Sequence, residues 1–305
     1  MSTLKPAFSS TFEEPNLTRK LNQVLTFIRG YPAQMPPPKT HVLLLISGGL
    51  DSTLLWLLLA LKYKLHVHPI HLQSLKKPSS QTKYLKKILP FFQSQLKNLY
   101  HQPLFLTYQL PLKSPSFQAS PPHLKNWNLA NLVVNPKTNQ TTVMAIANST
   151  RLFHFTAIAV QVAHQLRLTH NYNLTHIFFG LVPEDAQTAR ESTLTTLRSL
   201  TLTTTIIFGD PDWQLLAPID RKLNFYYPKP KLLQYGARHN FPFHLTWSCD
   251  YNGHYHCGLC YSCRGRKEAF QTANLPDPTP YRPNLNSLQD KLKQKLLTFK
   301  LRWYP

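Results

Sequence analysis

The apolar residues of this chain recur in the pattern of alternating strands and helices. Residues 42–46 form a short, wholly apolar run closed by glycines, which is typical of a parallel strand covered on both faces. Residues 52–63 are expected to form a helix, and residues 65–72 alternate between apolar and polar positions as a second strand does. The main domain is therefore predicted to open with a strand–helix–strand unit.

The same rhythm continues along the chain. We expect a helix over residues 81–100 that is interrupted at Pro90, and no regular structure over residues 111–140, which are rich in Pro, Asn and Ser. The other expected elements are a strand over 103–110, a helix over 150–168, a strand over 175–180, a helix over 191–200, a final strand over 202–208 and a short helix beginning near Lys231. This alternation predicts an α/β fold with a Rossmann-like parallel sheet flanked by helices.

Both ends of the chain are expected to be additions to this domain. Apolar residues recur at helical spacing between Leu17 and Ile28, Gly30 is a suitable stop, and a proline-rich linker covers residues 31–39. The expected division is an N-terminal extension over 1–40, a main domain over 41–245, a knuckle over 246–270 and a tail with a helix over 271–305.

The sequence SGGLDS lies between the first strand and the first helix of the main domain. A strand, a glycine turn and a helix N-terminus present several backbone N–H groups in one place, where the helix dipole also favours negative charge. Asp51 beside such a site is suited to hold Mg²⁺ or to orient the loop. The alternative is a tight turn without a ligand, whereas a Walker A loop is excluded by its missing lysine and spacing. The candidate phosphate site consists of Ser47, Gly48, Gly49, Leu50, Asp51 and Ser52.

All the cysteines of the chain lie close together, at Cys249, Cys257, Cys260 and Cys263. Four thiolates from one loop suit a tetrahedral Zn²⁺ in a closed structural site, and this clustering is unlike a disulfide scaffold. An iron–sulfur cluster and free thiols are the alternatives. His254 and His256 lie inside the loop and could replace one cysteine, although four thiolates make an outer position for them the better interpretation.

The chain is strongly basic, with 34 Lys and Arg against 13 Asp and Glu and a formal net charge of +21. Such a charge attracts polyanions, so nucleic acid is a candidate partner, while a basic surface that only aids solubility is an equal alternative. No apolar stretch approaches the roughly 20 residues needed to span a bilayer. Together with clustered cysteines that favour a reducing compartment, this leads us to expect a cytoplasmic protein without a membrane partner.

Two motifs resemble those of a known family. SGGxDS after a buried strand resembles the loop of the ATP pyrophosphatases (PP-loop superfamily), which grips ATP phosphates while a substrate oxygen attacks the α phosphorus. The stretch TWSCDYNGHYHCGLCYSCRGRKEAF resembles the C-terminal signature of the 7-cyano-7-deazaguanine synthase (QueC) family. The resemblance implies an adenine nucleotide α-hydrolase type of fold with a zinc knuckle, a homodimer, and the use of ATP, Mg²⁺ and Zn²⁺. It also implies conversion of 7-carboxy-7-deazaguanine to the nitrile with ammonia, through an adenylate.

The resemblance extends to a few positions between these motifs. It implies a catalytic, phosphate-contacting role for Lys229, a catalytic role for Arg151, and substrate contacts at Asp185 and Arg190, although each could be an ordinary surface or capping residue. The loop after Asp185 departs from the family, because it reads AQTAR where the family has a longer loop with a further acid. HLQSLKK likewise replaces the D-Y-G-Q-R-H element of the family after the second strand.

Three hypotheses follow for the function. The first is a QueC-like ligase that adenylates a 7-deazapurine carboxylate and joins it to ammonia or another amine, the acceptor being a macromolecule in an antiphage variant. The second is a PP-loop enzyme that modifies tRNA directly, which the net charge of +21 favours. The third is a zinc-stabilised module that binds nucleic acid or a protein partner without catalysis, which the intact phosphate loop argues against.

Overall fold

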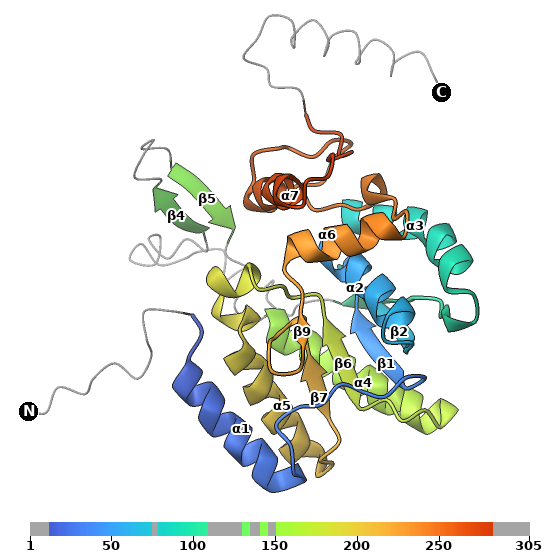
Figure 1. Ribbon diagram of the computed structural model, residues 1–305, viewed down its shortest axis with the longest axis vertical. Helices are drawn as coiled ribbons and strands as arrows, with labels where there is room; N and C mark the ends of the chain where they lie inside the picture. Colours follow the sequence, from blue (N-terminus) through green and yellow to red (C-terminus); the bar gives the residue numbers. More distant parts are fainter. Residues whose placement is uncertain (1–11, 75–78, 109–129, 135–140, 146–150, 283–305) are drawn as a thin grey trace, which may run out of the picture.

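A five-stranded parallel sheet forms the centre of the fold, with helices packed around it (Figure 1). The computed structural model describes residues 12–74, 79–108, 130–134, 141–145 and 151–282. The strands lie in the order β3-β2-β1-β6-β7, so the direction in which strands are added changes between β1 and β6. In open α/β sheets, ligands bind at such a switch point, outside the carboxyl ends of the strands. The strands are β1 (His41–Leu45), β2 (His66–Ser74), β3 (Leu104–Tyr108), β6 (His176–Phe179) and β7 (Gln214–Leu216).

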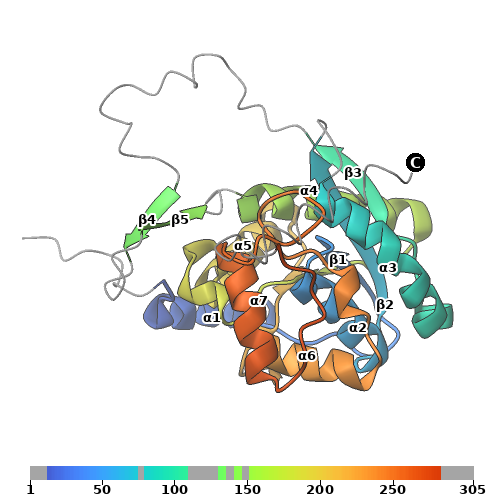
Figure 2. The ribbon, with the colours of Figure 1, turned by 90° about the horizontal axis from the view of Figure 1, so that it is seen from above.

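Helices cover both faces of this sheet, as the view in Figure 2 shows. One face carries α2 (Leu50–Leu61), α3 (Ser80–Leu96) and α6 (Lys229–Arg238), and the other carries α4 (Arg151–His170) and α5 (Leu194–Phe208). Side chains alternate along β1, because Val42 and Leu44 join the core on the α2 side while Leu43 joins the core on the α4 side. The predicted α/β class, with a parallel sheet flanked by helices, is confirmed.

Helix α2 follows the candidate phosphate loop and is buried along nearly its whole surface. Of its 12 residues, only Asp51 and Leu61 are not fully buried. A helix that is apolar all round belongs inside a core, and here α3 and α6 pack against it in addition to the sheet. The N-terminus of α2, and with it the loop before it, is therefore held rigidly.

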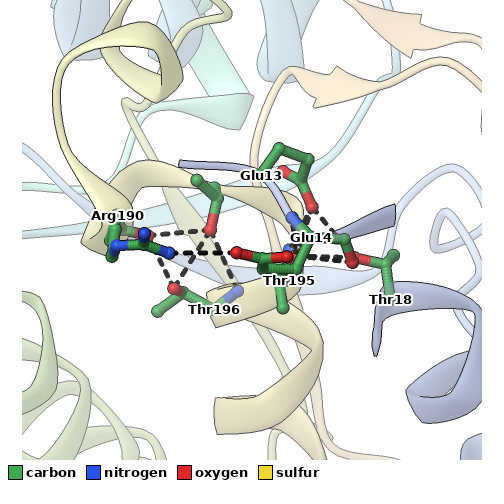
Figure 3. Close-up of polar contacts among 7 residues, drawn as sticks. Glu13, Glu14, Thr18, Arg190, Thr195 and Thr196 are labelled. Carbon is green, nitrogen blue, oxygen red and sulfur yellow. Dashed lines mark hydrogen bonds and ion pairs between the residues drawn. The ribbon is translucent and has the colours of Figure 1, made fainter. Parts of the chain in front are cut away.

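The N-terminal extension contains helix α1 (Pro15–Arg29), which packs against α5. Glu13, just before α1, accepts hydrogen bonds from the backbone N–H groups of Leu194 (2.8 Å) and Thr195 (3.0 Å). A carboxylate distant in sequence thus caps the N-terminus of α5, as Figure 3 shows. Gly30 ends α1 in the left-handed conformation with φ 85°. The predicted docked helix and its glycine stop are both confirmed.

The expected final strand over residues 202–208 is wrong, because these residues complete helix α5. β-branched residues favour strands, but the buried side chains of this segment recur at helical spacing. The hydroxyls of Thr201 and Thr204 donate to the carbonyls of Leu197 (2.7 Å) and Leu200 (2.8 Å), one turn earlier. Packing against the sheet therefore overrides the local strand preference, and the sheet ends instead with β7.

Helix α3 runs unbroken through Pro90, so the expected interruption there is also wrong. Proline cannot donate a hydrogen bond to the carbonyl of Lys86, one turn earlier. Both residues are exposed, so water can donate to that carbonyl instead. Ser79 begins the helix by accepting a hydrogen bond from the N–H of Thr82 (3.1 Å).

A hairpin corrects the expectation that residues 111–140 lack regular structure. Strand β4 (Ala130–Val134) pairs antiparallel with β5 (Thr141–Ala145). The rest of that stretch lies outside the described residues, as does the helix expected in the C-terminal tail.

Shorter elements complete the described chain. They are β8 (Ile219–Asp220), β9 (Phe225–Tyr226), α7 (Tyr261–Thr272) and the 3₁₀ turns Lys97–Leu99, Asp185–Gln187, Arg190–Ser192 and Phe243–Leu245. A buried ion pair between Arg198 and Asp220 joins α5 to β8. Among the described helices, none is both long enough and apolar enough to cross a membrane.

Candidate active site

The loop after β1 has the backbone geometry of an anion site. Gly48 adopts φ +82°, and a Cβ at this position would lie 2.4 Å from the carbonyl oxygen of Gln81, so only glycine fits. The N–H of Gly49 donates to the Ser47 hydroxyl (3.0 Å), which in turn lies 3.0 Å from the Ser52 hydroxyl. Among the described residues, no side chain caps the N-terminus of α2, so its first N–H groups are available to a bound anion.

Charged side chains meet directly beside this loop. The Lys229 ammonium, at the start of α6, lies 3.5 Å from Asp51 and 3.4 Å from Asp185. The Lys229 backbone N–H also donates to the Glu184 carboxylate (3.1 Å). Burial lowers the pKa of Lys229, but the nearby carboxylates outweigh burial and hold that pKa above its ordinary value. Lys229 is therefore a fixed cation at the phosphate loop.

Three carboxylates surround Lys229, since Asp51 and Asp185 pair with its ammonium and Glu184 accepts from its backbone N–H. Burial raises the pKa of Asp51 to about 6, against the opposing effect of Lys229. Within the described chain, one oxygen of Asp51 and one of Glu184 are buried without a hydrogen-bond partner. Buried carboxylate oxygens without a donor are the hard ligands that Mg²⁺ prefers, so the residues fit the expected magnesium ion.

A cleft of about 160 Å³ joins the loop to the C-terminal segment. Ligand pockets commonly measure roughly 300–1,000 Å³, so this cleft has room for the phosphate end of a nucleotide, and the remainder would extend beyond it. Its lining residues are Ser47, Gly49, Leu50, Asp51, Ser52, Gln81, Gly180, Asp185, Lys229, Ser248, Tyr261, Ser262 and Arg266. Five of the six predicted loop residues line it, whereas Gly48 shapes the turn behind them.

The four cysteines lie together in the geometry of a metal knuckle. Their sulfurs all lie within 4.8 Å of one another, and no disulfide joins them. The Sγ atoms are 3.9 Å apart both for Cys257 with Cys263 and for Cys249 with Cys260. Thiolates that bind one zinc at about 2.3 Å in a tetrahedron are separated by about 3.8 Å, so the cysteines fit Zn²⁺.

The histidines of the knuckle do not take a cysteine's place. His256 is fully buried, and its Nε2 accepts a hydrogen bond from the Ser248 N–H (3.1 Å), while His254 is exposed. His256 therefore supports the knuckle from outside the cluster, and it holds Ser248 at the edge of the cleft.

The knuckle contacts the phosphate loop directly. The Trp247 N–H donates to the Gly48 carbonyl (3.0 Å), and the Gly253 N–H donates to the Ser80 hydroxyl at the start of α3 (3.0 Å). Arg266 of α7 is fully buried and donates to the Ser248 hydroxyl (3.1 Å). The cysteine cluster thus positions the segment around Trp247 and Ser248, which closes one side of the cleft.

Gly180, at the end of β6, allows the sheet to approach α2. A Cβ at this position would lie 2.7 Å from the Cβ of Ser52 and 2.8 Å from its Cα. We expect Gly180→Ala to lower the free energy of unfolding by about 1–3 kcal/mol, as overpacking does, measured by denaturant unfolding. The control is Gly265→Ala in α7, where nothing lies within 4 Å; there alanine should stabilise by roughly 0.5–1 kcal/mol. Equal effects at both positions would contradict this account of Gly180.

Of the two arginines predicted for the site, Arg190 lies outside the cleft, and the role of Arg151 stays a prediction. Arg190 does not line the cleft; it forms an ion pair with Glu14 (3.2 Å) at the contact between α1 and the start of α5 (Figure 3). Arg151 is the first residue of α4, and its side chain lies outside the described part of the chain.

Sequence reasoning missed several residues of the cleft. Glu184 adds a carboxylate, Gln81 contributes from the start of α3, and Ser248, Tyr261 and Ser262 come from the knuckle and α7. Glu184 carried a local signal, because two adjacent acids follow the strand that ends at Gly180. The others come from elements whose approach to the loop only the tertiary fold reveals.

Short stretches of this chain are similar in sequence to known enzymes. The 7-cyano-7-deazaguanine synthase of Ruegeria pomeroyi is 52% identical over 54 residues, which is 18% of this chain and 24% of that protein. The synthase of Brucella anthropi is 42% identical over 73 residues, or 24% of this chain and 29% of that protein. The chain thus matches about a quarter of the length of these relatives.

A solved structure gives only a weak likeness. The U34-tRNA thiolase NcsA of Methanococcus maripaludis, with its [4Fe-4S] cluster, aligns at a TM-score of 0.36 and 10% identity over 95% of this chain and 80% of that one. The family profile is more extensive, because that of the queuosine biosynthesis protein QueC matches residues 41–274, from the start of β1 to the end of α7. The chain therefore belongs to the QueC family.

Proposed function

We propose that this protein is an ATP-dependent ligase that adenylates a 7-deazapurine carboxylate, 7-carboxy-7-deazaguanine or a close relative, and joins it to an amine. The observation that carries the proposal is the meeting, in one cleft, of an α2 N-terminus without a side-chain cap, the Lys229 ammonium and the carboxylates of Asp51 and Asp185. Such a site binds a polyphosphate through backbone N–H groups and a cation together. Membership of the QueC family favours an acid as the second substrate.

The residues of the cleft take distinct roles in this proposal. The loop N–H groups and the hydroxyls of Ser47 and Ser52 bind the β and γ phosphates of ATP. Lys229 stabilises the charge that develops on pyrophosphate as the carboxylate oxygen of the substrate attacks the α phosphorus and the bond to pyrophosphate breaks. An amine then displaces AMP from the adenylate, which gives the amide; the nitrile would need a second activation.

Metal ions complete the site. Asp51 and Glu184 would hold Mg²⁺ through their oxygens that lack a hydrogen-bond partner, and this ion would neutralise phosphate charge. The four cysteines would hold Zn²⁺ as a structural ion, because all four of its positions are taken by thiolates.

The substrate is expected to enter between the Asp185 turn and the C-terminal segment. The Asp185 carboxylate accepts a hydrogen bond from the Val182 N–H (3.1 Å), which holds the turn after β6 in place. Ser248, Tyr261 and Ser262 face it from the other side of the cleft. The turn in this chain reads AQTAR, which is shorter than the family's loop and lacks its acid, and this difference suits an acid or an amine acceptor different from the usual ones.

Pyrophosphate release tests the reaction. With ATP and Mg²⁺, we expect pyrophosphate to form only when 7-carboxy-7-deazaguanine is added, and mass spectrometry with ammonia present should show the amide or nitrile. Release that requires tRNA and ignores the acid would overturn the proposal and favour the tRNA-modifying hypothesis, which rests on the net charge of +21. A homodimer remains a prediction, to be measured by sedimentation.

A further inference from the structure

Histidines gather at the end of the sheet opposite the cleft. His41 is the first residue of β1 and pairs in register with His66, the first residue of β2; His68 follows two residues later on the same face. His101 precedes β3. Because the active-site loop follows the carboxyl end of β1, these side chains at the amino ends belong to a separate place in the fold.

One nitrogen from each of His41, His68 and His101 lies within 4.8 Å of the other two. The closest pair is His41 Nδ1 and His68 Nε2, at 2.8 Å. Imidazole nitrogens that share one zinc at 2.0–2.1 Å in a tetrahedron are about 3.4 Å apart. The closest pair is shorter than this value and no pair is farther apart than 4.8 Å, so small ring rotations would bring all three nitrogens onto one ion.

Neighbouring rings hold the histidines in place. His41 stacks with Tyr172 (centroids 4.1 Å apart, planes at 10°) and with His66 (4.7 Å, 14°). The nitrogens His66 Nδ1 and His101 Nε2 lie 3.3 Å apart, so His66 also orients His101. Ligands fixed by neighbouring groups before binding are typical of built metal sites.

The partners of these rings indicate what the cluster binds. In the described chain, His41, His68 and His101 contact other rings, and none of these contacts is with a carboxylate. A neutral imidazole offers one nitrogen lone pair to a metal ion. Of His41 Nδ1 and His68 Nε2, 2.8 Å apart, one carries a hydrogen, and moving that hydrogen to the other nitrogen of its ring frees both lone pairs for an ion.

We propose that His41, His68 and His101 form a second metal site, for a divalent ion of the zinc, cobalt and nickel class. Three imidazoles suit these ions and leave one tetrahedral position to water. The ion would tie the amino ends of β1 and β2 to the segment before β3. It is independent of the cysteine knuckle and of the proposed ligase reaction.

Metal binding to the untagged full chain tests this proposal. After equilibration with micromolar Zn²⁺ and gel filtration, the wild-type chain should retain about two zinc ions, one of them in the knuckle. With the knuckle already filled by zinc, added Co²⁺ should give visible d–d bands of a nitrogen-ligated ion, without thiolate charge transfer. The proposal would be overturned by a single ion per chain, or by Co²⁺ spectra that show thiolate charge transfer and no bands of a nitrogen-ligated ion.

Variants locate the second ion. His68→Asn and His101→Gln should each weaken binding of the second ion by at least about 100-fold while the knuckle zinc stays, which shows that the chain is folded. His101 lies before β3 rather than inside a strand, so its variant is the less disturbing of the two. The control is His164→Gln on the exposed side of α4, which should retain both ions. Wild-type affinity in both cluster variants would contradict the assignment.

Discussion

Replacing Lys229 with methionine should lower ATP-dependent pyrophosphate release by about 10²–10³-fold, the loss that follows removal of a preorganised group that stabilises charge in the transition state. Methionine keeps most of the length of the side chain but removes the ammonium that lies 3.5 Å from Asp51. Without it, the carboxylates of Asp51 and Asp185 would lose the ammonium that they share beside the phosphate loop. Initial rates at saturating ATP and acid, together with single-turnover rates, measure the effect on the chemical step.

The matched control is Lys231→Met, two residues later on α6. Lys231 is exposed and contacts the Tyr226 carbonyl at 3.4 Å, away from the cleft. The Lys231→Met enzyme should release pyrophosphate at close to the wild-type rate, because Lys231 does not line the cleft. The comparison is matched, since both substitutions remove one positive charge from the same helix. A Lys229→Met enzyme that loses no more activity than Lys231→Met would remove Lys229 from the mechanism. Thermal unfolding of both variants checks that the lower activity is not caused by misfolding.

The sequence alone predicted the parts of the site whose residues lie next to one another along the chain. SGGLDS carries its own strand, turn and helix start, and the cysteines at 249, 257, 260 and 263 all lie in one loop and the first turn of α7. Backbone N–H groups and sulfur ligands from one segment need no distant partner to form a site, so local chemistry predicts them. Four of the five strands of the sheet, β1, β2, β3 and β6, were predicted for the same reason, because their apolar spacing is local.

Features that depend on tertiary packing were not predictable in this way. Residues 202–208 carry a strand-like run of β-branched residues, yet the Thr204 hydroxyl donates to a helical carbonyl and the buried face packs on the sheet. Arg190 was matched to the substrate loop, but its place is set by Glu14, from the far N-terminus. His41, His68 and His101 come from separate segments, so no spacing along the chain announces them.

Loss of one zinc ligand is expected to disable the phosphate loop without unfolding the sheet. Binding of structural zinc supplies roughly 10–16 kcal/mol of folding free energy in small zinc-finger peptides. Cys249→Ser removes one of the four thiolates, and we expect it to abolish metal binding at the knuckle. The segment that it orders includes Trp247, whose N–H holds the Gly48 carbonyl, and Ser248 at the cleft. Pyrophosphate release should therefore fall below detection. The strand core around Val42 and Leu44 is a separate apolar cluster, and it should persist.

Hydrogen exchange separates this local effect from global unfolding. In Cys249→Ser, backbone amides of residues 246–260 and of the loop at Gly48 should exchange much faster, while those of β1 and β2 keep their protection. His254→Ala is the matched control, because His254 is exposed inside the same loop and is not one of the four clustered ligands. It should retain the thiolate-to-metal absorption of the cobalt-substituted knuckle and its activity. Faster exchange throughout the sheet in Cys249→Ser would mean that the knuckle supports the whole fold, and unchanged exchange at Gly48 would mean that it does not position the loop.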